Sequence, residues 1–92
     1  MLTMTHHAQA RLQQRGIPHN VIENLLDFGH EARSHNGSRI VYFDHRARQH
    51  LRRQFGTDSY KRIEPYLDAY AVVADTGEVI TVGHRTRRII RH

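Results

Sequence analysis

The stretch EARSHNGSRIVYF at residues 31–43 changes the pattern of the chain from helical to alternating. Asn36-Gly37 lies at its centre, and this dipeptide between two alternating segments is the strongest short-range signal for a β-hairpin. We therefore predict two antiparallel strands, Glu31 to His35 and Ser38 to Phe43.

Two short helices are predicted before this hairpin. Thr5 is a suitable N-cap for the first helix, which extends to Arg15 and ends at Gly16. Pro18 suits the first turn of the second helix, which ends at Gly29. The apolar face of this second helix consists of Val21, Ile22, Leu25, Leu26 and Phe28.

A third, strongly basic helix is predicted after the hairpin. Asp44 is expected to cap it and Gly56 to end it, with Ala47, Leu51 and Phe55 as its apolar stripe. The rest of its surface carries Arg46, Arg48, Arg52 and Arg53. The segment from Thr57 to Pro65 is expected to be a connection.

The remaining chain predicts a second hairpin and completes the fold class. Its strands run from Tyr66 to Ala74 and from Glu78 to Thr86, joined through Asp75-Thr76-Gly77. The order helix, helix, strand, strand, helix, strand, strand indicates an α+β fold formed by residues 1–92 as one domain. We expect a four-stranded antiparallel sheet with the helices on one face and the other face partly open.

The charge of the chain favours a polyanionic partner. The net charge is +5, and 13 of the 14 basic residues are arginine. Arginine is preferred where bidentate phosphate contact or stacking is needed. Residues 1–46 carry a net charge of +1 and residues 47–92 a net charge of +4, so the second half should supply most of this surface.

Composition also argues against several classes of protein. The chain has no cysteine, so disulfides and thiolate metal sites are excluded. Its apolar runs are too short to cross a bilayer, and we expect a cytoplasmic protein. Nine histidines do not show the spacing of a metal site, and no phosphate-binding glycine loop occurs, so no metal or other cofactor is expected.

The last predicted strand presents two candidate catalytic residues, His84 and Arg85. Strict alternation places Ile80, Val82 and His84 on one face and Arg85 on the other. If Ile80 and Val82 face the helices, Arg85 faces the open side. His84 is then either a structural residue at the core margin or, with a bulge at Gly83, a site residue.

The first helix carries a second candidate group. His7, Arg11 and Arg15 are spaced four residues apart, so they form one polar edge beside the apolar stripe. This edge either borders a groove or is a solvated face. Tyr42 is a candidate for stacking on a base, if it lies on the open face.

Three segments resemble a family of small bacterial and phage domains grouped with RelE/ParE-type toxins. They are HAQARLQQRGI at residues 7–17, the following Val-Ile-x-x-Leu-Leu helix, and the late strand VITVGHR at residues 79–85. The resemblance extends from His7 to Arg88 and implies a metal-independent ribonuclease of the barnase and EndoU kind. It also implies that Arg85 lies near the scissile phosphate.

The chain departs from the toxin pattern in three places. Such toxins usually begin with a strand, and many have a tyrosine for proton transfer soon after the segment that matches Gly83 to Arg85. Here a helix comes first, Ile89, Ile90 and Arg91 occupy the tyrosine region, and a third helix separates the hairpins. These departures make His7 the more natural proton carrier.

The resulting hypothesis is a toxin that cleaves RNA through attack of the substrate's own 2'-hydroxyl. The expected catalytic residues are His7, Arg11, Arg85 and His84, and the expected RNA-binding residues are Arg15, Arg48, Arg52, Arg87, Arg88 and Tyr42. RNA, a small acidic antitoxin and a second copy of the chain are the partners considered. The alternatives are a non-catalytic module that binds nucleic acid or an acidic partner, and a ParE-like inhibitor of another protein.

Overall fold

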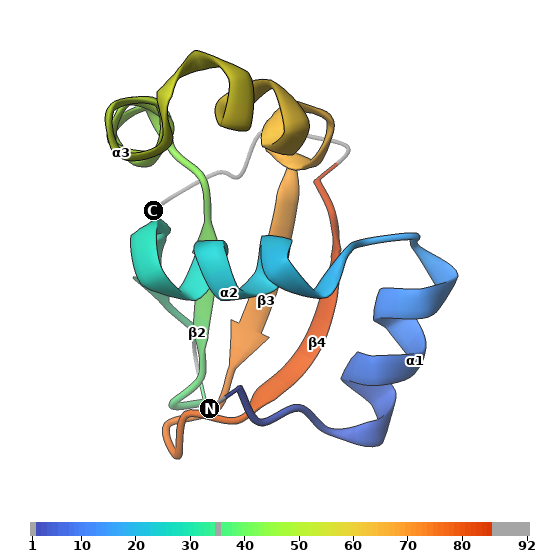
Figure 1. Cartoon of the computed structure of the whole chain (residues 1–92). Helices are drawn as coiled ribbons and strands as arrows, with labels where there is room; N and C mark the ends of the chain where they lie inside the picture. Colours follow the sequence, from blue (N-terminus) through green and yellow to red (C-terminus); the bar gives the residue numbers. More distant parts are fainter. Residues whose placement is uncertain (1, 35, 86–92) are drawn as a thin grey trace.

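Four antiparallel strands in the spatial order β1-β2-β3-β4 form the sheet of this α+β protein. The computed structural model describes residues 2–34 and 36–85 (Figure 1). Its elements are α1 (His6–Gln14), α2 (His19–Phe28), β1 (His30–Arg33), β2 (Arg39–Tyr42), α3 (His45–Ile63), the 3₁₀ helix η1 (Glu64–Tyr66), β3 (Ala69–Val73) and β4 (Val79–His84). This order confirms the fold class predicted from the sequence.

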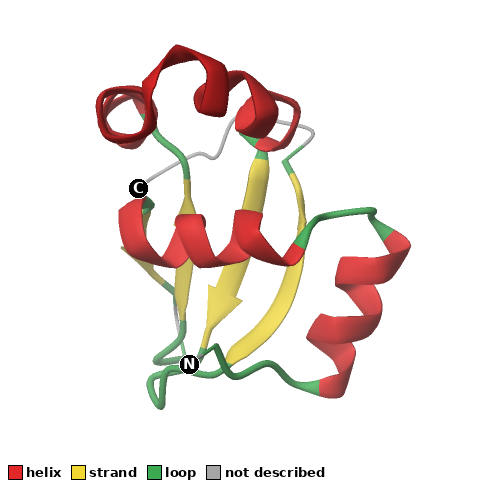
Figure 2. Ribbon diagram, in the orientation of Figure 1, coloured by secondary structure: helices red, strands yellow, loops and turns green. Residues whose placement is uncertain are grey.

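The helices pack on one face and at one end of the sheet. Helix α2 crosses the face, α1 lies beside β4, and α3 lies over the end at which β2 finishes and β3 begins (Figure 2). Alternate strand residues meet the helices, and Val41, Ala71 and Val82 are buried there. No helix among the described residues covers the opposite face, which we call the open face (Figure 1).

Helix α1 is fastened to β4 through its own cap. The Thr5 hydroxyl accepts a hydrogen bond from the Ala8 amide at 3.1 Å and donates one to the Ile80 carbonyl at 3.0 Å. Beside it, Met4 pairs with Val79 in a short parallel bridge. The predicted N-cap is thus confirmed, and it also fixes where α1 lies along the sheet.

Gly29 permits close contact between α2 and the sheet. Its φ of −69° is accessible to any residue, so its role is not conformational. A Cβ atom there would lie 2.4 Å from the Leu25 carbonyl oxygen and 2.7 Å from Val41 Cγ1. The absence of a side chain therefore lets the end of α2 pack directly on β2.

A bulge in β4 corrects the predicted alternation. Val73 pairs with Val79 while Val72 pairs with Thr81, which leaves Ile80 as the extra residue. Val79 and Val82 are both buried, whereas Ile80 is 36% exposed. The prediction that Ile80 faces the helices is wrong, because the bulge shifts the alternation by one residue.

The third helix is longer than predicted. Gly56 has a φ of 78° and kinks the helix, but the chain then resumes helical structure to Ile63. Tyr60 and Ile63 are buried and give this second part its own apolar contacts, so Thr57 to Pro65 is not a simple connection. Phe55, the third residue of the predicted stripe, is 39% exposed, whereas Ala47 and Leu51 are buried.

The second hairpin begins later than predicted. Residues 64–66 form η1, with Pro65 in its first turn, and β3 starts only at Ala69. Proline favours such a turn because its φ is fixed and it has no amide hydrogen. The first hairpin is confirmed, and the Ser34 amide donates to the Ser38 carbonyl at 2.9 Å where its strands end. The predicted strand end at His35 lies outside the described residues.

Candidate functional site

A row of four residues crosses the open face at the end of the sheet next to α3. The strand register aligns His30 with Tyr42, Tyr42 with Tyr70, and Tyr70 with Gly83. The residues next to them along each strand face the helices, so these four positions lie on the open face. We call them the open-face row. It brings histidine and tyrosine from three strands together.

Arg85 follows β4 and extends over this row. Its guanidinium carbon lies 4.7 Å from the centroid of the Tyr42 ring, within the range of a cation–π contact. Gly83 leaves room for Tyr70 at this point, since a Cβ atom on Gly83 would lie 3.0 Å from Tyr70 Cε1. The sheet and the Tyr42 ring therefore fix the position of the Arg85 cation.

Arg85 also retains unused hydrogen-bonding capacity. Its Nε atom is buried and has no hydrogen-bond partner in the described part of the chain. A buried donor without an acceptor costs about 1–3 kcal/mol, so an incoming acceptor would be favourable here. A guanidinium donates two parallel hydrogen bonds to phosphate, and Arg85 is suited to that ligand.

His30 approaches the same tyrosine from the other side of β2. Its ring centroid lies 5.4 Å from that of Tyr42, in an edge-to-face arrangement. Its Nδ1 atom lies 3.5 Å from Asp44 Oδ2, while Asp44 Oδ1 accepts a 2.8 Å hydrogen bond from the Ala47 amide at the start of α3. One carboxylate thus caps α3 and orients His30.

These residues combine three chemical functions. Arg85 can bind and neutralise a phosphate, the His30 imidazole can act as a general acid or base, and Asp44 can hold that imidazole in one orientation. Arg85 and His30 both contact the Tyr42 ring. We call Arg85, Tyr42, His30 and Asp44 the Arg85 site.

His84 is half-buried at the core margin, where its ring nitrogens contact two protein groups. Its Nδ1 lies 2.9 Å from Asp68 Oδ1, and its Nε2 lies 3.3 Å from the Arg15 carbonyl oxygen. Both partners are acceptors, so a doubly protonated ring satisfies both contacts. The Asp68 carbonyl also accepts a 2.7 Å hydrogen bond from the Arg85 amide. The contacts among Asp68, His84 and Arg15 therefore hold the end of β4 and fix the position at which Arg85 leaves the sheet.

The structure does not bring His7 to Arg85. Helix α1 runs beside β4 from the Thr5 contact at Ile80 to the Arg15 contact at His84. His7 is exposed near the first end and precedes Arg15 by eight residues, which is about 12 Å along a helix. Arg11 is half-buried between them. These residues border β4 but do not form one site with Arg85.

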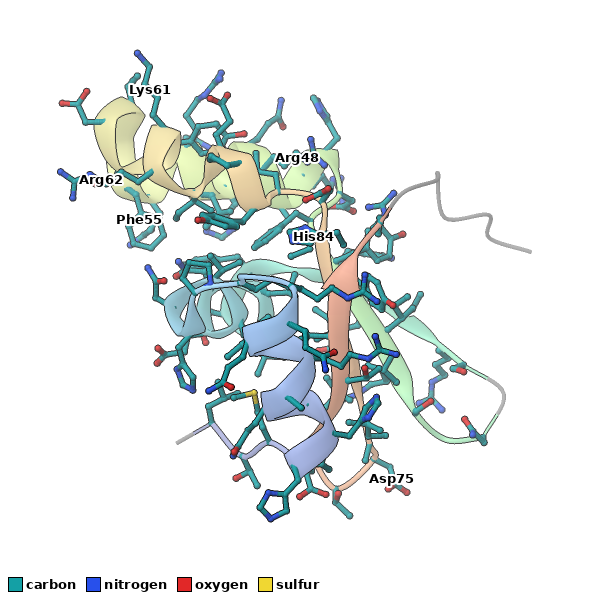
Figure 3. The ribbon with its side chains drawn as sticks, turned by 90° about the vertical axis from the view of Figure 1, so that its right-hand side faces the viewer. Arg48, Phe55, Lys61, Arg62, Asp75 and His84 are labelled. Atoms are coloured by element: carbon teal, nitrogen blue, oxygen red, sulfur yellow. The ribbon has the colours of Figure 1, made fainter. Side chains whose placement is uncertain are left out.

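The other predicted RNA-binding residues differ in their environments. Arg48 is structural, because its Nε donates to the Phe43 carbonyl at 3.1 Å and a terminal nitrogen donates to the Leu67 carbonyl at 3.2 Å. It lies at the same end of the sheet as His84 (Figure 3). Arg52 is exposed and lies 5.0 Å from the Tyr60 ring centroid.

Two further predictions concern Tyr42 and the arginines after β4. Tyr42 is only 3% exposed and lies under the Arg85 guanidinium, which leaves little of its ring accessible for stacking on a base. Arg87 and Arg88 lie outside the described residues. His30 and Asp44 were not predicted as site residues, since only the strand register brings them to Tyr42.

The described residues offer neither a metal site nor a membrane-spanning helix. Within residues 2–34 and 36–85, no group of three histidine or acidic side chains could hold a metal ion. In the same part of the chain no helix combines the length and apolar character needed to cross a membrane. Comparison with protein-family models, curated proteins and solved structures found no match.

Proposed function

We propose that this chain is a metal-independent endoribonuclease and that the Arg85 site is its active site. The observation that carries the proposal is the convergence of Arg85 and His30 on Tyr42, with Asp44 behind His30. A phosphate-binding cation beside an oriented imidazole is the minimum that RNA cleavage by internal attack requires.

The reaction follows from the positions of these groups. His30 takes the proton of the ribose 2'-hydroxyl, and the resulting oxygen attacks the adjacent phosphorus. Arg85 stabilises the negative charge that gathers on the phosphate oxygens. The bond to the 5' oxygen then breaks, and water supplies the proton to that oxygen. The products are a 2',3'-cyclic phosphate and a 5'-hydroxyl end.

Helix α3 supplies the surface for the rest of the RNA. It contains six lysine and arginine residues and one aspartate, a net charge of +5, which equals that of the whole chain. It lies at the end of the sheet where β4 finishes, and Arg85 follows β4 directly in the chain (Figure 1). Its exposed cations include Arg46, Arg52 and Arg53. Such a surface binds phosphates with little dependence on sequence.

The same charge supports a second candidate, a non-catalytic nucleic-acid-binding module. In that case Arg85 and α3 hold phosphates and His30 has no chemical role. The two functions predict different consequences for a His30 variant. Growth arrest on expression, relieved by Arg85→Ala, would extend the ribonuclease proposal to a toxin.

The test compares cleavage with binding in the presence of a chelator. We expect His30→Gln to lower the RNA cleavage rate by about 10²-fold or more while changing RNA affinity less than about twofold. His19→Gln is the matched control, because His19 Nδ1 also lies 3.5 Å from a carboxylate, Glu23 Oε1, but on the exposed surface of α2. It should leave the cleavage rate unchanged.

Two results would overturn the catalytic proposal. One is wild-type protein that binds RNA but cleaves neither free RNA nor ribosome-bound message. The other is an equal loss of rate in His30→Gln and His19→Gln. Arg85→Ala should reduce both cleavage and affinity, since Arg85 contacts the phosphate in either function.

A further inference from the structure

A second polar hollow lies at the other end of the sheet, between the turns of the two hairpins. It has a volume of about 390 Å³ and is lined by Arg33, Ser34, Gly37, Ser38, Arg39 and Asp75. Figure 3 shows Asp75 at the turn between β3 and β4, far from His84 at the opposite end of β4. This hollow is therefore separate from the Arg85 site.

Two arginines form one wall of the hollow. Arg33 and Arg39 are direct partners in the register of β1 and β2, and like charges placed opposite each other are destabilising. Glu31 accepts a 3.0 Å hydrogen bond from a terminal nitrogen of Arg39. The Nε atom of Arg39 is nevertheless buried without a hydrogen-bond partner among the described residues. An anion at this wall would offset the repulsion and could accept from the arginines.

The hairpin backbone holds two hydroxyl groups in the lining. The Ser34 amide donates to the Ser38 carbonyl at 2.9 Å, which fixes the relative positions of the two serines. Ser38 is buried, and its hydroxyl donates to Asn36 Oδ1 at 3.0 Å. A hydroxyl that donates in one direction can still accept from a ligand. The hydroxyl groups of Ser34 and Ser38 can therefore contact the polar groups of a ligand that lie next to its anionic group.

Asp75 determines which anion fits. The turns approach each other here, since a Cβ atom on Gly37 would lie 3.9 Å from Asp75 Oδ2. A carboxylate disfavours a bare phosphate dianion but accepts hydrogen bonds from sugar hydroxyls, as acidic residues do for ribose in nucleotide-binding folds. The lining thus favours a ligand with a phosphate at Arg33 and Arg39 and hydroxyls at Asp75.

We propose that this hollow binds a ribose-phosphate group. Its volume lies within the range of about 300–1,000 Å³ that is usual for small-molecule sites. The group can come from a free mononucleotide or from a nucleotide of a longer RNA. The proposal does not depend on ribonuclease activity, because none of its residues belongs to the Arg85 site.

The first experiment measures binding of ribose 5-phosphate by calorimetry and by NMR of the full chain. We expect shifts at the Ser34 and Ser38 amides, and an affinity about tenfold higher than for inorganic phosphate or ribose. Arg39→Gln and, separately, Arg33→Gln should each weaken binding about tenfold or more. His19→Gln, which changes an exposed side chain of α2 that belongs to neither site, is the control and should not change it.

Asp75→Asn and a pair of longer ligands complete the test. Asp75→Asn should remove most of the preference for ribose 5-phosphate over inorganic phosphate, because the variant binds the bare anion better. Tighter binding of a mononucleotide than of a short RNA with blocked ends would identify the free nucleotide as the source, and the reverse would identify RNA. The proposal is overturned if millimolar ribose 5-phosphate shifts neither serine amide, or if His19→Gln weakens binding as much as Arg39→Gln.

Discussion

Replacing Gly29 with alanine tests how much the close packing of α2 on β2 contributes to the stability of the fold that supports the Arg85 site. The backbone at Gly29 has a φ of −69° and a ψ of 159°, which alanine adopts without strain. The substitution therefore destabilises the fold sterically, because the added Cβ atom would lie 2.4 Å from the Leu25 carbonyl oxygen and 2.7 Å from Val41 Cγ1. Overpacking costs about 1–3 kcal/mol, and contact with a backbone atom indicates the upper end, about 3 kcal/mol.

A domain of this size should lose about 15 °C in Tm for that change in the free energy of unfolding. Thermal unfolding followed by circular dichroism measures the loss, with Gly16→Ala as the control. Gly16 has a φ of 63°, and a Cβ atom added there would have no neighbour within 4 Å, so alanine costs only the backbone penalty, about 1–2 kcal/mol. The reasoning is refuted if Gly29→Ala is no more destabilising than Gly16→Ala.

Three further substitutions test separate contacts. Asp44→Asn should keep the cap of α3 and change the free energy of unfolding by less than about 0.5 kcal/mol, as measured by urea unfolding. It should nevertheless slow RNA cleavage about tenfold in a cleavage assay, because it removes the charge beside His30. Leu51→Ala should lower the free energy of unfolding by about 3 kcal/mol in urea unfolding, because Leu51 is buried. Phe55→Ala should lower it clearly less, because Phe55 is partly exposed, and equal losses would instead place Phe55 in the core. Thr5→Ala should cost about 1 kcal/mol and loosen α1, seen as faster amide exchange in that helix alone.

Features encoded by neighbouring residues could be predicted from the sequence. The caps at Thr5 and Asp44 are confirmed by hydrogen bonds to the Ala8 and Ala47 amides. The turn at Asn36-Gly37 is confirmed by the pairing of β1 with β2, and Gly37 has a φ of 82°. Each of these depends on two to four consecutive residues, and local preferences decide such features.

Features that depend on distant partners could not be predicted. The bulge at Ile80 arises where β4 must bury Val79 and Val82 on one face and also receive the Thr5 hydroxyl. His30 lies directly after Gly29, and nothing near it in the sequence indicates that Tyr42 and Asp44 will be its neighbours. The predicted arginine, Arg85, lies over Tyr42 on the open face, but the histidine that also contacts Tyr42 is His30 and not one that the sequence spacing favoured.

Under the proposed function, the burial of Tyr42 limits how the Arg85 site would recognise RNA. Its ring supports a cation instead of offering a platform for a base, so base stacking cannot supply specificity at this position. The groups that remain are Arg85, His30 and the exposed cations of α3, and these contact phosphate and sugar more readily than base edges. Recognition should then depend on backbone charge, and affinity should fall steeply with salt while varying little among single-stranded sequences. A strong preference for one base next to the cleaved bond would point to stacking on Tyr70, the half-buried tyrosine of the open-face row, because the cation–π contact of Arg85 is with Tyr42.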